Sequence, residues 1–420
     1  NDFQVPLLEQ VVTIAFDPKH ADRSKANELL VTMKEHPEMW RRADAILESS
    51  NDPMTRYFGL QILEHTISTR WNILPSEQRE GIRNYVVGKI ISLSSDEQTS
   101  RDNSSKQFLN RSNLVLVQIL KRDWPHNWPS FIPDIVGSSK VSESLCENNM
   151  KILKLLSEEI FDYSKESMTA AKVKTLKDTL NEEFSQVFEL CRFILDNSRK
   201  VSLVNSTLMT LQRFLTWIPL VYIFQTPLLP TLIEKFFPVA AFRVTTTDCM
   251  IEVASLPASE IPDGWHGELQ KMLVLFVQQL TNIMPANSDI AQAYENGTEE
   301  DCNFVQRLAL FLVTFLKAHW KLFDKSGIPE LEKTLMNSLF YLLRISVVQE
   351  EEIFKTCLEF WHFFTQQLYD ADSEFRSSAG LKLGGFSPGV QKPGNILYCD
   401  VLHQLRHVMI DHMAKPEEVI

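Results

Sequence analysis

Two Trp-Pro pairs, four residues apart, restrict most strongly what this chain can fold into. Trp124-Pro125 and Trp128-Pro129 directly follow a stretch whose apolar residues recur at three- and four-residue steps, the period of an amphipathic helix. Proline lacks an N–H and disfavours a helical residue before it, so this helix should end near Asp123. A second helix can begin at Pro129, because proline at the first helical position loses no needed hydrogen bond. The sequence therefore predicts a helix, a sharp corner filled by two indoles, and another helix.

The same alternation of apolar-periodic stretches and proline breaks continues along the whole chain. Several short helices are expected between residues 219 and 256. Longer helices are expected at residues 4–16, 21–35, 37–49, 53–70, 75–93, 106–122, 142–161, 168–197, 200–216, 266–284, 300–322, 329–347, 350–369 and 398–413. They group into helix pairs of roughly 35 to 60 residues, a period typical of HEAT repeats. This pattern predicts an all-α HEAT-repeat α-solenoid, a right-handed superhelix of antiparallel helix pairs with about eight repeats and the start of a ninth.

The expected repeats divide the chain into four parts. Residues 1–140 are assigned to the first repeats and residues 141–371 to further repeats. Residues 372–397 are rich in Gly, Ser and Pro, which predicts an exposed loop. Residues 398–420 are interpreted as the first helix of a truncated repeat. The polar segment 94–105 is also expected to be a loop.

Composition argues against several classes of protein. The net charge of −12 disfavours a DNA-binding surface, because phosphate binding needs concentrated Lys and Arg. No apolar run is long enough for membrane insertion to be expected. The six cysteines lie singly, without the paired spacing of zinc sites, which predicts reduced and mostly buried thiols.

Side chains that could support catalysis are scattered. Acidic clusters such as Glu182-Glu183 and Glu350 to Glu352 fall on helical text, where adjacent carboxylates point in different directions. His403 and His407 share the spacing of a metal-binding pair, but no third ligand is evident. We therefore expect no enzyme, no metal and no cofactor.

Surface residues of two helices remain as candidates for binding a partner. In the helix 53–70, Phe58 and Ile62 belong to the inward apolar stripe, as do Leu63 and Ile67. The polar residues expected outside the stripes of the helices 53–70 and 106–122 include Gln61, Glu64, Asn113 and Lys121. The alternative for each of these residues is plain solvation, with no partner bound.

The corner Trp-Pro-x-x-Trp-Pro resembles the amino-terminal region of the β-karyopherins, the nuclear transport receptors of the importin-β superfamily. Further stretches carry the same likeness, in the expected order: His36-Pro37 to Trp40, 57–64 (YFGLQILE), Thr69-Arg70-Trp71, 142–161, Trp217-Ile218-Pro219 and 413–418. Within the family, these stretches are similar to the receptors that export proteins bearing leucine-rich signals.

The resemblance implies several properties of the chain. The first repeats would bind the small GTPase Ran in its GTP state, cooperatively with cargo. Aromatic-lined crevices between outer helices would meet Phe-Gly nucleoporins, and the protein would shuttle between nucleus and cytoplasm. Carried onto this sequence, the Ran surface falls on the helices 21–35, 53–70 and 106–122. The implied polar contacts to Ran are Gln61, Glu64, Asn113 and Lys121.

The groove for leucine-rich signals and the acidic loop that locks Ran are expected beyond Ile420. Cargo binding is therefore expected only of a longer chain. The alternative is a HEAT-repeat structural scaffold of another protein complex. Such a scaffold would share the helix pairs, but would have no reason to carry the Trp-Pro corner.

Overall fold

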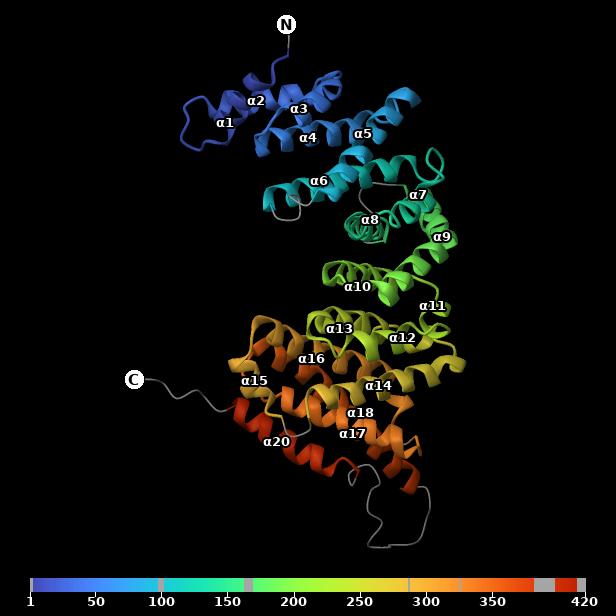
Figure 1. The fold of residues 1–420 in the computed structure, drawn as a ribbon. Coiled ribbons are helices and arrows are strands. Elements are labelled where there is room, and N and C mark those ends of the chain that lie inside the picture. The colour runs from blue at the N-terminus through green and yellow to red at the C-terminus, as the bar shows by residue number, and fades with distance from the viewer. Residues whose placement is uncertain are drawn as a thin grey trace, which may run out of the picture. The chain divides into compact units, whose positions relative to one another are not determined.

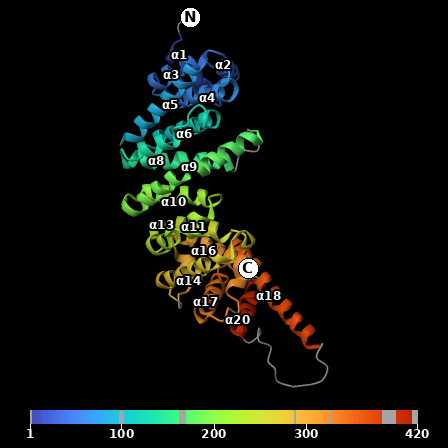
Figure 2. The ribbon, with the colours of Figure 1, turned by 90° about the vertical axis from the view of Figure 1, so that its right-hand side faces the viewer.

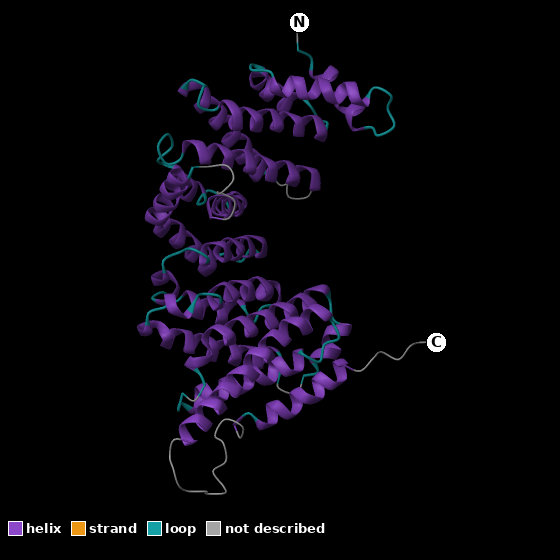
Figure 3. Ribbon diagram, turned by 180° about the vertical axis from the view of Figure 1, so that it is seen from behind, coloured by secondary structure: helices purple, strands orange, loops and turns teal. Residues whose placement is uncertain are grey.

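The computed structural model describes residues 3–96, 102–161, 169–285, 288–324, 326–380 and 397–413. All regular elements in these ranges are helical (Figure 3). By their internal contacts the residues form two units, Asn1–Phe214 and Leu215–Ile420, which are described separately. For the described residues, the predicted all-α class is confirmed.

The first unit consists of successive antiparallel helix pairs (Figure 1 and Figure 2). Its helices are α1 (Val5–Phe16), α2 (Arg23–Glu35), α3 (Ala43–Ser49, after a 3-10 turn at Met39–Arg42), α4 (Pro53–Arg70), α5 (Ser76–Ser95), α6 (Asn103–Asp123), α7 (Phe131–Ser138), α8 (Glu143–Phe161), α9 (Ala170–Asn197) and α10 (Val201–Leu215). The second helices α2, α4, α6 and α8 contact one another in series. We call them, with α10, the second-helix row, and α1, α3, α5, α7 and α9 the first-helix row.

The second unit repeats this arrangement. Its helices are α11 (Leu220–Phe224), α12 (Leu228–Thr231, continued by a π-helical turn at Leu232–Phe236), α13 (Ala240–Ala254), α14 (His266–Ile283), α15 (Ile290–Asn296), α16 (Glu299–His319), α17 (Pro329–Ile345), α18 (Glu351–Gly380) and α20 (Cys399–Met413). Short 3-10 turns lie at Ala258–Glu260, Asp263–Trp265 and Trp320–Leu322. The helices α13, α16 and α18 contact in series, and so do α14, α17 and α20. Two layers of helices from paired repeats are the organisation of a HEAT solenoid.

Local sequence explains where α4 begins. The Asp52 carboxylate accepts a hydrogen bond from the backbone N–H of Thr55 at 2.7 Å, and Pro53 occupies the first helical position. These residues satisfy a donor that would otherwise lack a partner at the helix start and preset the backbone angle there. Asp102 caps α6 in the same way, through Ser105 at 2.8 Å. The predicted bounds of the helix 53–70 are confirmed.

Several predicted boundaries are wrong. The helix α18 continues to Gly380, so residues 372–380 are helical rather than loop, while 381–396 lie outside the described residues. The Gly and Pro residues that suggested a loop are concentrated after Gly380. The composition of residues 372–397 taken together does not show that the first part of the range lacks them. The segment predicted as a loop at 94–105 is shortened at both ends, by α5 and α6.

The helix after the corner begins at Phe131, two residues later than predicted. The Trp128 Nε1–H and the Ser130 hydroxyl donate to the same Asp134 carboxylate oxygen, at 3.1 and 2.7 Å. These bonds hold residues 128–130 as a turn in front of α7. The short helix α15 was not predicted.

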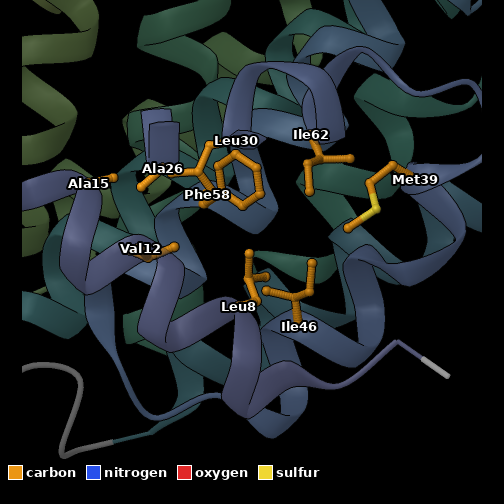
Figure 4. Close-up of a cluster of buried hydrophobic side chains, with 9 residues drawn as sticks. All are labelled: Leu8, Val12, Ala15, Ala26, Leu30, Met39, Ile46, Phe58 and Ile62. Carbon is orange, nitrogen blue, oxygen red and sulfur yellow. The ribbon is translucent and has the colours of Figure 1, made fainter. Parts of the chain in front are cut away.

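The first two helix pairs share a hydrophobic core (Figure 4). It consists of side chains at most 8% exposed: Leu8, Val12, Ala15, Ala26, Leu30, Met39, Ile46, Phe58 and Ile62. Burying a side chain the size of Leu or Ile stabilises the fold by about 1.5–3 kcal/mol. Leu63 and Ile67 are buried as well, so the predicted inward stripe of α4 is confirmed.

Candidate partner-binding surface

The accessible polar side of α4 includes Gln61 and Glu64, both half-buried, as expected for residues opposite its apolar stripe. Glu64 forms an ion pair with Arg111 of α6, and the Arg111 guanidinium lies 5.3 Å from the ring centroid of Tyr57. Burial raises the pKa of the Glu64 carboxyl, and the Arg111 charge opposes part of this shift. This side of α4 therefore presents a carboxylate that is partly desolvated and already oriented.

Asn113 is fully buried, which contradicts the predicted exposure. Its amide exchanges two hydrogen bonds with the amide of Asn148 on α8, at 2.8 and 3.0 Å. Each amide supplies the donor and acceptor that the other needs, which makes its burial tolerable. Asn113 therefore joins two helices of the second-helix row.

Lys121 is also buried, at 7% exposed, so its predicted exposure is wrong too. Its ammonium lies 2.7 Å from the carboxylate of Glu159 on α8. The reason is the same for both residues. Periodicity locates the stripe that faces the helix's own pair partner, but a helix in a row is also covered by its two neighbours. Sequence reasoning missed the α8 partners of both residues, Asn148 and Glu159. It also missed Arg111 on α6, the partner of Glu64.

The Trp-Pro corner is held by packing and by a buried carboxylate. Trp124 is 1% exposed and meets Phe131 edge-on at 6.3 Å between ring centroids. Trp128 is only half-buried, 5.3 Å from the same ring, with the Arg83 guanidinium 4.9 Å from its centroid. Pro125 follows a cis peptide bond and is half-buried, while Pro129 is exposed. The corner is thus filled by one indole and bordered by the other.

Asp123, at the end of α6, organises the polar side of this corner. Its carboxylate, 2% exposed, accepts a hydrogen bond from Trp71 Nε1 at 2.7 Å. Guanidinium nitrogens of Arg79 and Arg83 lie 3.9 Å from it. Sequence reasoning used Asp123 only as a helix end. Little in the sequence indicates that Asp123 has charged partners, because both arginines lie about forty residues earlier in the chain.

Two large, mostly apolar crevices lie along the first-helix row among the described residues. One of about 1050 Å³ lies where α7, α8 and α9 meet, and its apolar lining includes Val141 and Phe193, which are 77% and 63% exposed. The other, of about 520 Å³, lies between α5 and α7 beside Trp128 and Phe131. Exposed aromatic and aliphatic side chains at a crevice are typical of sites that bind other proteins.

Two other kinds of site find no support in the part of the chain that the structure describes. In those ranges, no group of three or more His, Cys, Asp or Glu side chains is arranged to hold a metal ion. None of the helices there combines the length and apolar composition needed to cross a bilayer.

Comparison with known proteins adds three family matches in order along the chain. Residues 26–92 match the importin-beta N-terminal domain. Residues 105–250 match the Exportin 1-like protein family, and residues 333–369 match the chromosome region maintenance or exportin repeat. The second match includes both the Trp-Pro corner and the block 142–161.

Curated relatives agree with these matches. The chain is 42% identical to Exportin-1 of Schizosaccharomyces pombe, over 100% of this chain and 39% of that protein. It is 43% identical to Exportin-1 of Drosophila melanogaster, over 99% and 38%, and 24% identical to Exportin-5 of Dictyostelium discoideum, over 85% and 32%. The chain thus spans about two fifths of the length of the Exportin-1 proteins that it matches. It belongs to the exportin family of the importin-β superfamily of HEAT-repeat proteins.

Proposed function

We propose that this chain is part of a nuclear export receptor, acts by binding rather than by catalysis, and shuttles between nucleus and cytoplasm. The observation that carries the proposal is the 42–43% identity to Exportin-1 proteins along essentially its full length. Cargo with leucine-rich signals is assigned to the longer protein. The alternative, a HEAT scaffold of another complex, does not account for the exportin match over residues 105–250.

Ran-GTP is the proposed partner of the second-helix row. Gln61 and Glu64 are its proposed direct contacts, because they lie on the accessible side of α4 within the importin-beta N-terminal domain match. The orientation of Glu64 by Arg111 lowers the entropic cost of an ionic contact to a partner. Asn113 and Lys121 are proposed to act indirectly, by fixing α6 against α8.

A direct test measures binding of this chain to Ran loaded with a non-hydrolysable GTP analogue, and to Ran-GDP. The variants Gln61→Ala and Glu64→Arg should weaken GTP-selective binding, and Glu77→Arg on the first-helix row should not. Glu77 is a suitable control because it is exposed and lies on α5. Lys121→Glu should also weaken binding, but together with a loss of thermal stability, as expected for a residue that acts through packing. Binding that no α4 variant alters would refute the proposed surface.

The two crevices of the first-helix row are the proposed contacts for Phe-Gly nucleoporins. A phenylalanine of a repeat could enter a crevice beside Phe193 or beside Trp128, and its burial would supply the weak affinity needed for rapid release. Phe193→Ser should reduce retention of the chain on an immobilised Phe-Gly peptide. Phe16→Ser is the matched control, because Phe16 is 54% exposed and lines neither crevice. Equal retention of both variants would exclude the larger crevice.

A further inference from the structure

A third cavity of the first unit, about 280 Å³, differs from the two crevices because basic side chains line it. It lies between the amino-terminal halves of α6 and α8, the start of α10 and the last turn of α5, and three lysines line it. The lysines are Lys106 on α6, Lys151 on α8 and Lys200 just before α10. We call this cavity the lysine pocket.

One carboxylate, that of Glu147, lines the pocket and pairs with two of the three lysines. It accepts from Lys151 at 3.1 Å, Lys200 at 3.0 Å and the Ser202 hydroxyl at 2.7 Å. Although burial acts to raise it, the pKa of Glu147 is lowered by these three donors, so the group is ionised at neutral pH. Three ammonium groups and one carboxylate leave the pocket with a net charge of about +2.

Lys106 has no ion pair among the described residues, although its side chain borders the cavity. Asp102, one turn earlier, attracts Lys106 only through space, since its carboxylate accepts hydrogen bonds from the N–H groups of Ser104 and Ser105 at the start of α6. A purely structural network would require Glu147 with Lys151 and Lys200, but it would not require Lys106. The third lysine therefore points to a ligand.

Neutral donors and helix orientation add to this preference for an anion. The Ser144 hydroxyl and the Asn110 amide also line the pocket, whereas the Ser202 hydroxyl already donates to Glu147. The amino-terminal ends of α8 and α10 border the pocket with their positive dipole ends, which favours a bound anion. Asp102 already caps the start of α6, and the carboxyl end of α5 borders the pocket. The cavity is several times larger than the ~30 Å³ that one water takes in the liquid, so a phosphate group with its bonded carbon fits.

We propose that the lysine pocket binds a phosphate monoester through Lys106, Lys151 and Lys200. A phosphate monoester carries a charge of about −1.5 to −2 at pH 7, which matches the excess charge of the pocket, whereas a single carboxylate would leave one ammonium uncompensated. The phosphate can belong to a phosphorylated serine of another protein or to a free small molecule. Neither this site nor its test depends on Ran or on Phe-Gly binding.

The test compares two fluorescein-labelled peptides, Gly-Gly-Ser-Gly-Gly and its phosphoserine form, by fluorescence anisotropy with the 420-residue chain. We expect binding of the phosphopeptide only, and an affinity lowered about tenfold or more by Lys106→Glu, because a charge-assisted hydrogen bond is replaced by repulsion. Lys106→Arg should retain binding. Lys19→Glu is the matched control, since Lys19 is exposed in the loop between α1 and α2.

Competition identifies the source of the phosphate. If inorganic phosphate displaces the phosphopeptide at a similar concentration, the pocket serves a free phosphate compound. If displacement needs about tenfold more inorganic phosphate than phosphopeptide, the pocket serves a phosphorylated protein segment. Equal binding of the two peptides, or a phosphopeptide affinity unaffected by Lys106→Glu, would overturn the proposal. Because Lys106 is exposed, a folding defect does not complicate this result.

Discussion

The two units connect neighbouring second helices with the same kind of ion pair, but in different surroundings. In the first unit, Lys121 on α6 meets Glu159 on α8, and their side chains are 8% and 20% exposed. In the second unit, Lys317 on α16 meets Glu359 on α18, and the exposed fractions are 39% and 69%. A pair removed from water costs desolvation energy and tolerates only one geometry, whereas an exposed pair constrains little. The first unit therefore fixes its helix register with polar groups more than the second does.

The second unit relies instead on a chain of aromatic side chains. Phe276 on α14 lies between Phe237 and Phe311, with ring centroids 4.5 and 4.1 Å away, and Phe311 continues to Phe315 at 5.8 Å. Aromatic rings bury a large area and accept several relative orientations. One repeat architecture is thus stabilised by buried aromatic area in one region and aligned by polar contacts in another.

The largest effect is expected from Phe311→Ala in the aromatic chain. Phe311 is fully buried, and a cavity of that size costs about 3–5 kcal/mol of unfolding free energy. Urea unfolding followed by circular dichroism measures the loss. Phe193→Ala, at a side chain 63% exposed, should change the midpoint by no more than about 0.5 kcal/mol. Similar losses in both variants would contradict a stability dominated by the aromatic chain.

A smaller loss is expected from Asn113→Leu in the first unit. The substitution leaves the buried amide of Asn148 without its partner, which costs about 1–3 kcal/mol. The double variant with Asn148→Leu removes both polar groups and should recover most of that loss. The same unfolding measurement on the two single variants and the double variant gives the coupling energy. Additive losses would show that the amide pair is not a unit.

The contrast between the two ion pairs can be tested directly with a matched pair of variants. Lys121→Met leaves the carboxylate of Glu159 largely buried without its partner. The free energy of unfolding should fall by about 1–2 kcal/mol, less than for a fully buried pair because Glu159 is partly exposed. Lys317→Met removes an exposed pair and should cost less than about 1 kcal/mol. Thermal unfolding of both variants measures the two losses of stability. Equal losses would contradict the proposed difference between the buried and the exposed ion pair.

Sequence reasoning predicted the parts of the molecule that depend on local chemistry. The helix 53–70 has the predicted bounds because Asp52 and Pro53 determine its start within three residues. The exposure of Asn113 and Lys121 could not be predicted in that way, because it depends on Asn148 and Glu159, which lie 35 and 38 residues later. A hint existed, since the helix 142–161 is apolar around most of its circumference and still carries Asn148.

A last prediction concerns pH and separates the units by a single buried histidine. His319, at the end of α16, is 2% exposed and lies 5.0 Å from the ring of Phe315. Burial lowers its pKa below the ordinary value of about 6.5, and the nearby His266 acts in the same direction. Between the folded and unfolded pKa values, the unfolded state binds more protons, so stability rises with pH in that window. The stability contributed by the neutral His319 is complete above about pH 6.5. It is lost as the pH falls towards the pKa of His319 in the folded state.

We therefore expect a lower urea midpoint for the second unit at pH 5.5 than at pH 7.5, and a smaller difference in His319→Leu. His403→Leu, at an exposed histidine of α20, is the control and should keep the pH difference of the unchanged chain. Cysteine labelling during unfolding assigns the transition to a unit. Cys146 and Cys191 report on the first unit and Cys249 and Cys357 on the second, because all four are buried in the folded chain. If acid exposed Cys146 and Cys191 first, the polar contacts of the first unit, rather than His319, would be the more sensitive to pH.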